Sequence, residues 1–118
     1  MADVKVFGLK NCDTCKKART WLDQAGVAHE FIDYRDHPVP AATLRAWADA
    51  VGGWEKLVNR ASTTWRGLAE DRKQPADAAA WTALIAEHPA LVRRPVLVRA
   101  AGEVSVGFKK AAWGPWFA

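Results

Sequence analysis

The sequence predicts an α/β fold built on a four-stranded mixed sheet. Three observations lead to this prediction. A strand, an amphipathic helix and a second strand follow one another over residues 4–34. Helical periodicity then dominates residues 40–90, and two short β-like runs and a closing helix make up the rest. The expected order is βαβ, a helical insertion at about residues 40–90, a ββ hairpin and a C-terminal helix, all within one domain over residues 1–118.

The first unit is the most regular part of the chain. Residues 4–8 alternate around β-branched side chains and form the expected first strand. Asp13 or Thr14 is the expected N-cap of the following helix, and Gly26 ends that helix. Its apolar face, at spacings of three and four, is Ala18, Trp21, Leu22 and Ala25. Residues 29–34 form the second strand, which a right-handed crossover makes parallel to the first.

The middle of the chain is predicted to be helical. Leu44, Trp47, Ala48 and Val51 share one helical face, and this helix ends at Gly52-Gly53. Short helical turns are expected at residues 54–58 and 64–69. A longer helix is expected at 76–87, and its inward face is Trp81, Leu84 and Ile85.

The last part of the chain completes the sheet. Residues 95–98 and 104–106 are short β-like runs joined through residues 100–103. Residues 109–117 form a final helix, with Trp113, Trp116 and Phe117 packed inward. The tryptophans are therefore interpreted mainly as core residues rather than as base-stacking platforms.

The amino-acid composition argues against several classes of protein. Half of the 118 residues are hydrophobic and 25% are charged, which argues against intrinsic disorder. No apolar stretch reaches membrane-spanning length, and residues 1–5 lack a charged leader followed by an apolar run, so a cytoplasmic protein without membrane contact is expected. The formal charge of +4 is spread along the chain, so direct nucleic-acid binding is not expected. A monomer is expected.

Two cysteines carry the chemistry, in the order Cys12-Asp13-Thr14-Cys15. At the junction of a strand and a helix, the first cysteine meets the unsatisfied N–H groups and the dipole of the helix, which stabilise a thiolate. Cys12 is therefore the expected nucleophile. Cys15 lies one turn further into the helix and is the expected resolving thiol, which attacks a mixed disulfide formed on Cys12.

Simpler alternatives stay open for the two cysteines. Both could be inert core residues. A structural zinc is the other alternative, but one Cys-x-x-Cys supplies only two ligands, and His29, His37 and His88 match no common finger spacing. No metal site and no tightly bound cofactor are therefore predicted.

Three separated segments resemble the arsenate reductase (ArsC) family, in its Spx- and YffB-like branch. They are NCDTCKKAR at residues 11–19, NRASTTWR at 59–66 and RPVLV at 94–98. The similarity extends over nearly the whole chain. It implies a thioredoxin-like fold with a helical insertion.

The resemblance also implies roles for particular residues. Cys12 matches the family nucleophile, which attacks an arsenic or disulfide centre and is released by glutathione with glutaredoxin. Arg60 and Arg94 match two arginines that bind the oxyanion or stabilise the thiolate, a task suited to the planar, permanently charged guanidinium. Surface ion pairing is the alternative for both. Pro95 matches a cis proline facing the active site, with an ordinary trans proline as the alternative, and Asn11 adjoins the nucleophile.

The chain departs from arsenate reductases proper at three places. It has Gly8 and Gly107 where those enzymes carry a histidine and a third arginine. Lys109 is close enough in sequence to replace the missing charge, although a solvent-exposed role is equally open. Cys15 is absent from arsenate reductases and YffB-like proteins and is shared with Spx-like regulators.

The resemblance and the residues together predict a glutathione-dependent thiol/disulfide reductase. In it, the Cys12 thiolate attacks a small disulfide or an oxyanion, and glutathione is the co-substrate. The alternative is a Spx-like redox-sensing transcriptional regulator that binds RNA polymerase and uses a Cys12–Cys15 disulfide as its switch. A third alternative is a relic of the fold without redox activity.

Overall fold

A computed structural model describes residues 4–117 of the chain, with the side chain of Ala112 left aside. Residues 1–3, part of the segment examined above for a leader, and Ala118 lie outside the described residues. The chain forms two compact units. We call the part up to Tyr34 and from Arg94 onward the sheet unit, and Arg35–Arg93 the helical unit. The helical unit corresponds to the expected insertion and is slightly longer than predicted.

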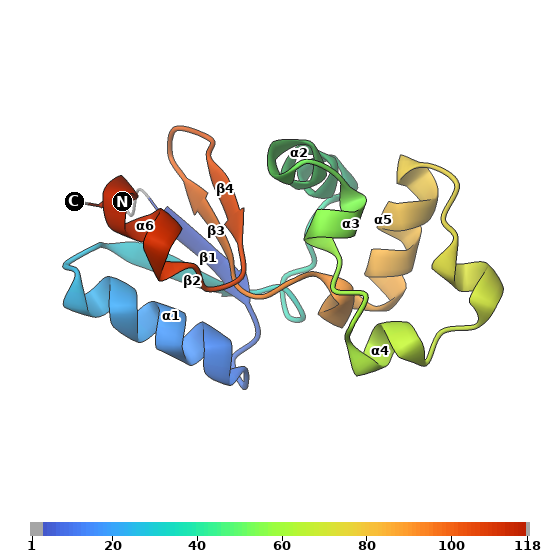
Figure 1. Cartoon of the computed structure of the whole chain (residues 1–118), viewed down its shortest axis with the longest axis horizontal. Coiled ribbons are helices and arrows are strands. Elements are labelled where there is room, and N and C mark those ends of the chain that lie inside the picture. The colour runs from blue at the N-terminus through green and yellow to red at the C-terminus, as the bar shows by residue number, and fades with distance from the viewer. Residues whose placement is uncertain (1–3, 118) are drawn as a thin grey trace. The chain divides into compact units, whose positions relative to one another are not determined.

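The sheet unit contains the predicted four-stranded mixed sheet (Figure 1). The strands are β1 (Val4–Gly8), β2 (His29–Asp33), β3 (Val96–Arg99) and β4 (Val104–Val106), in the order β2-β1-β3-β4. Strand β2 runs parallel to β1, whereas β3 is antiparallel to both β1 and β4. The end of β1 therefore lies beside the end of β2 and the start of β3.

Helices α1 (Asp13–Gln24) and α6 (Lys110–Trp116) pack on one face of this sheet (Figure 1). The core that joins them is Val4, Val6, Ala18, Leu22, Leu97 and Trp113. Trp21 of α1 meets Trp113 of α6 edge to face, with ring centroids 5.8 Å apart. Trp116 and Phe117 pack on this core but remain half-buried, so only Trp113 is fully inward as the sequence predicted.

The helical unit consists of α2 (Ala41–Val51), α3 (Trp54–Leu57), α4 (Thr63–Arg66) and α5 (Ala78–Glu87). Two 3₁₀ turns, η1 (Glu70–Lys73) and η2 (Pro89–Leu91), were not predicted. Helix α5 begins two residues later than expected because Asp77 is its N-cap and accepts the Ala80 amide at 2.9 Å.

The inward face of α5 is only partly as predicted. Leu84 and Ile85 are buried. Trp81 is half-buried and stacks between two other indoles, Trp54 and Trp65, each with a centroid distance of 6.0 Å. Trp81 is therefore the middle ring of an aromatic stack.

None of the helices in the described part of the chain is long and apolar enough to span a membrane.

The buried polar contact between β4 and α6 gives a first prediction. The Trp113 indole N–H donates to Ser105 Oγ at 3.0 Å, and both side chains are buried. Ser105→Ala leaves that N–H unsatisfied and should lower the free energy of unfolding by about 1–3 kcal/mol. Urea denaturation measures the change. Thr20→Ala, which removes an exposed hydroxyl from α1, is the control and should stay within about 0.5 kcal/mol.

Candidate active site

The candidate site lies where β1 ends and α1 begins, in the sheet unit. Three hydrogen bonds donated by backbone amides hold this loop. The Cys12 amide donates to Leu9 O at 3.2 Å, the Tyr34 amide donates to Gly8 O at 3.1 Å, and the Lys10 amide donates to the buried Asp33 carboxylate at 3.0 Å. The loop is therefore fixed by the residues that end β2.

Cys12 itself is the N-cap of α1, with extended φ and ψ of −96° and 121°. The prediction that Asp13 or Thr14 caps this helix is wrong. Asp13 lies in the first turn, where its carboxylate interacts favourably with the helix dipole but does not cap the helix. Thr14 is exposed in the same turn. No capping hydrogen bond of ordinary geometry reaches the Cys12 sulfur. The amide of Cys15 faces it nevertheless and favours the thiolate.

The pKa of the Cys12 thiol lies below its ordinary value. Partial burial is the largest single influence and opposes ionisation. The Cys15 amide, the Cys15 thiol and the Arg94 guanidinium together outweigh it, because each donates a hydrogen bond to the thiolate and Arg94 adds an attractive charge. Cys12 is half-exposed, so this stabilised thiolate remains accessible to a reagent.

Cys15 is in the opposite situation. Its exposed fraction is 1%, and this burial raises the pKa of its thiol to about 11. The Leu9 amide favours its ionisation, but the hydrogen bond to Cys12 and the negative charge there oppose it. Cys15 is thus held as a protonated donor to Cys12 while Cys12 is the thiolate.

Arg94 is half-buried directly before Pro95 and β3. Its guanidinium donates to Cys12 and to the Tyr34 hydroxyl, which accepts. Burial raises the pKa of Tyr34 to about 12, so the phenol stays neutral. Sequence reasoning missed Tyr34 and Asp33. The available signal was their place at the end of β2, where Asp33 is the last residue and Tyr34 the next, because the carboxyl ends of parallel strands meet at one sheet edge.

The neighbours named from the sequence lie as follows. The Arg94–Pro95 peptide bond is cis, as the resemblance implied, and Pro95 is buried. Asn11 is exposed in the turn before Cys12. Gly107 has a φ of +78°, a conformation that side chains rarely adopt, and its amide donates to Pro95 O at 2.9 Å. A side chain at position 107 of this chain, such as the arginine that the resemblance implied for arsenate reductases, would therefore be strained.

Of the two remaining cations named from the sequence, Arg60 belongs to the helical unit and Lys109 to the sheet unit. Arg60 is exposed between α3 and α4 of the helical unit. Lys109 is exposed at the N-cap position of α6. Neither is among the groups that shift the pKa of Cys12 in the part of the chain that the structure describes. Their roles stay predictions.

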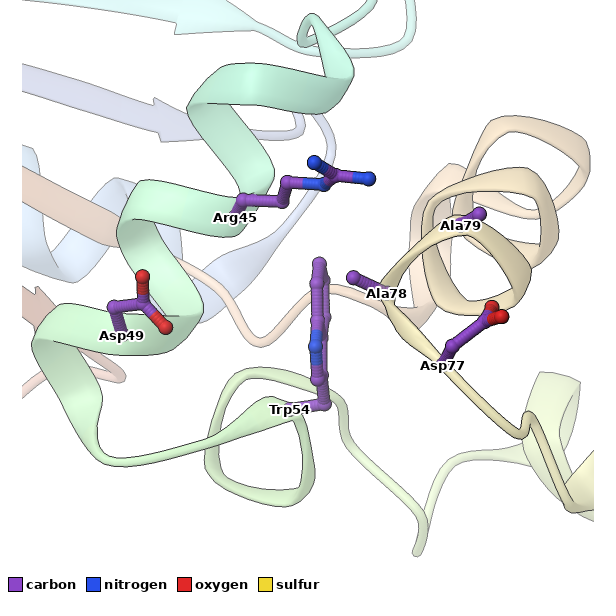
Figure 2. Close-up of a pocket in the computed structure, with 6 residues that line it drawn as sticks. All are labelled: Arg45, Asp49, Trp54, Asp77, Ala78 and Ala79. Atoms are coloured by element: carbon purple, nitrogen blue, oxygen red, sulfur yellow. The ribbon is translucent and has the colours of Figure 1, made fainter.

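The helical unit has a cavity of its own, of about 350 Å³ (Figure 2). It is lined by Arg45, Asp49, Trp54, Asp77, Ala78 and Ala79. Figure 2 shows the indole of Trp54 between α2 and α5, Arg45 reaching toward it, and the Asp77 carboxylate turned away from it. No cysteine lines this cavity. Thiol chemistry therefore rests on the sheet unit. Over residues 4–117, no three potential metal ligands gather at one place.

The contact with Arg94 predicts a change in reactivity with pH. Arg94→Met removes a donor and a positive charge, so the pKa of Cys12 should rise and its alkylation by iodoacetamide should need higher pH. The wild type should reach half-maximal rate below the ordinary thiol range. Mass-spectrometric alkylation rates from pH 4 to 10 measure this. Arg93→Met, which changes the exposed neighbour, should leave the profile unchanged.

Tyr34→Phe tests the same network one step further out. The ring is kept, but the Arg94 guanidinium loses its acceptor and is held less firmly against Cys12. We expect the alkylation profile to move toward higher pH, by less than for Arg94→Met. A profile identical to that of the wild type would show that Arg94 is held without Tyr34.

Comparison with known proteins agrees with this geometry. The ArsC family profile matches residues 7–115. A protein of Haemophilus influenzae, described as uncharacterized, is 37% identical over 98% of this chain and 99% of its own length. An arsenate reductase of Neisseria meningitidis is 28% identical over 91% of this chain and 92% of its own. The global transcriptional regulator Spx of Streptococcus agalactiae is 28% identical over 80% and 69%.

Solved structures extend the similarity. The YffB protein is 42% identical, with a TM-score of 0.88 over 98% of this chain and 99% of that one. An ArsC-related protein from Brucella melitensis is 44% identical, with a TM-score of 0.74 over 99% and 95%. The α/β fold is thus the thioredoxin-like fold that the sequence predicted. The family match over residues 7–115, together with the Cys12 site, establishes that the chain belongs to the ArsC family.

Proposed function

We propose that this protein is a glutathione-dependent thiol/disulfide reductase. The observation that carries the proposal is the unequal pair of sulfurs: a half-exposed Cys12 with a lowered pKa beside a buried Cys15 with a raised one. Disulfide exchange requires a nucleophilic thiolate, and a second thiol within hydrogen-bonding contact can resolve the mixed disulfide that it forms. The family membership supports a thiol oxidoreductase, since named relatives include arsenate reductases.

The reaction begins with Cys12. Its thiolate attacks one sulfur of a small disulfide, forming a Cys12–substrate disulfide and breaking the original S–S bond. The other half leaves as a thiolate and takes a proton from the solvent. A glutathione thiolate then attacks the mixed disulfide, the second half of the substrate leaves, and another glutathione restores Cys12 while glutathione disulfide forms. Two glutathiones are oxidised for each substrate disulfide reduced.

Cys15 offers a second way to resolve the adduct. It loses its proton to the solvent and attacks the Cys12 sulfur, so that a Cys12–Cys15 disulfide forms and the substrate half leaves as a thiolate. Two glutathiones then reduce the internal disulfide. Burial and the Cys12 charge both raise the pKa of Cys15, so Cys15 ionises more readily once the Cys12 charge has been consumed in the adduct.

Arg94 holds the anionic part of the substrate in this proposal. Glutathione carries two carboxylates, and a guanidinium already beside the sulfur supplies paired donors to them or to an oxyanion. Arg60 and Lys109 are proposed as further anion contacts. Arsenate is the second substrate class to test, although Gly107 leaves the site without the third family arginine. We propose a cytoplasmic monomer without a tightly bound cofactor, with glutaredoxin as an accessory reductant.

One observation favours a second candidate function. Cys15 lies against Cys12 as a disulfide switch requires, and the chain is 28% identical to the regulator Spx over 80% of its length. In this alternative, oxidation to the Cys12–Cys15 disulfide changes binding to RNA polymerase.

Turnover in a coupled assay tests the reductase. The wild type, Cys12→Ser and Cys15→Ser are each supplied with glutathione, glutathione reductase, NADPH and either a small mixed disulfide or arsenate. Cys12→Ser should fall to the rate of the mixture without protein, because serine is not ionised at neutral pH. Cys15→Ser should keep part of the turnover, because glutathione can resolve the Cys12 adduct directly.

The controls separate the outcomes. Equal loss in both variants would show that the internal disulfide is obligatory. No turnover by the wild type with either substrate would overturn the reductase, and binding of the oxidised and reduced protein to RNA polymerase would then test the alternative.

A further inference from the structure

We propose that Gly8 is a positioning residue for Cys15: the missing side chain at the end of β1 makes the space in which the Cys15 sulfur meets Cys12. This inference rests on the proposed function, because it concerns the step in which Cys15 resolves a Cys12 adduct. It assigns a chemical role to a residue that carries no functional group of its own.

The geometry at Gly8 is specific to one atom. A Cβ built on Gly8 would lie 2.5 Å from Cys15 Sγ, closer than real Cβ atoms approach any heavy atom. The next neighbours, Phe31 Cε1 at 3.4 Å and Cys15 Cβ at 3.6 Å, are at ordinary contact distances. An alanine at position 8 would therefore collide with the sulfur of residue 15 and with no other atom.

The backbone does not call for a glycine here. Gly8 is absent from the glycines with positive φ, which are Gly26, Gly52, Gly53, Gly102 and Gly107. It ends β1 in register with Asp33, and its carbonyl accepts the Tyr34 amide. Glycine inside a strand is less stable than alanine because it loses more backbone freedom on folding. The reason for glycine is therefore the space that the sulfur fills.

The sulfur has little room to avoid a new methyl group. Cys15 lies in α1 with an exposed fraction of 1%, so it cannot turn into solvent. Only its first side-chain torsion can move Sγ, and helices exclude one of the three staggered positions for most residues. Any rotation that clears position 8 also moves Sγ relative to Cys12. A side chain at position 8 should therefore disturb attack on Cys12 and weaken the hydrogen bond from the Cys15 thiol, while the Cys15 amide and Arg94 still favour the Cys12 thiolate.

A side chain at position 8 should slow the step in which Cys15 resolves the Cys12 adduct. After Cys12 has formed a mixed disulfide, Cys15 gives up its proton to the solvent, and its thiolate attacks the Cys12 sulfur in line with the bond to the substrate. The Cys12–Cys15 bond forms, the Cys12–substrate bond breaks, and the substrate leaves as a thiolate. In-line attack depends steeply on placement, and a misplacement of about 1 Å can cost about 100-fold in rate.

Ellman's reagent separates the two steps in one experiment. Attack by Cys12 on this aromatic disulfide releases one thionitrobenzoate, and attack by Cys15 on the adduct releases a second. At a pH where the alkylation profile shows Cys12 fully ionised in both proteins, Gly8→Ala should keep the first release near the wild-type rate and slow the second by about 10-fold or more. The assay needs no physiological substrate, so the inference can fail while the reductase stands, and the reverse also holds.

A double-mutant cycle tests whether Gly8→Ala acts by displacing the sulfur of Cys15. Gly8→Ala should lower the urea midpoint in the wild-type background and raise it in a Cys15→Ala background, where the methyl group of residue 15 leaves room. Both Cys15→Ala proteins should release one thionitrobenzoate at the same rate. Gly114→Ala is the matched glycine control, because a Cβ there meets nothing within 4 Å; it should leave both releases unchanged.

Two results would overturn the proposal. One is a second release in Gly8→Ala as fast as in the wild type. The other is a shift of the urea midpoint by Gly8→Ala that has the same sign and size with and without Cys15.

Discussion

The site depends on holding one sulfur at the N-terminus of α1, where β1 stops. Burial resists a negative charge at Cys12, and the charge is stable there only because the Cys15 amide, the Cys15 thiol and Arg94 all face the sulfur. These donors come from a helix and from the segment before a distant strand, so the thiolate requires the whole sheet unit to be folded. The loop that carries Cys12 is fixed in turn by the Asp33 carboxylate and the Tyr34 amide.

The two cysteines differ because of depth and not because of residue type. One turn of helix separates them, yet one is half-exposed and the other is 1% exposed. At Cys12 the hydrogen-bond donors lower the pKa of the thiol by more than burial raises it. At the more deeply buried Cys15, burial has the larger effect and the pKa is raised. The same desolvation that makes Cys15 a poor nucleophile makes it a good donor to the Cys12 thiolate. The position of α1 on the sheet thus suits Cys12 for attack on the substrate and Cys15 for resolution of the mixed disulfide.

Sequence patterns predicted the fold well and the site only in part. Alternating strands and three- and four-residue spacings were enough for the sheet and the main helices, because those patterns reflect which face is buried. The predicted N-cap of α1 was wrong. Aspartate is a common N-cap residue and cysteine is not, so the sequence favoured Asp13 over Cys12. Tyr34 was missed because an aromatic residue at a strand end looks like core. Gly8 was noted only as a departure from a family pattern, since a contact with Cys15 Sγ has no sequence period.

Topology explains how distant residues meet at one sulfur. Gly8 pairs with Asp33 in the parallel ladder, and Phe7 pairs with Val96 in the antiparallel one. Tyr34, which follows β2, and Arg94, which lies two residues before the start of β3, are therefore placed at the edge where β1 ends. The chain leaves the sheet unit directly after Tyr34 and returns at Arg94. The helical unit is thus an insertion between Tyr34 and Arg94, two residues that are hydrogen-bonded to each other. The hydrogen bond from Arg94 to Tyr34 therefore joins the points at which the chain leaves and re-enters the sheet unit, and it also holds the guanidinium that stabilises the Cys12 thiolate.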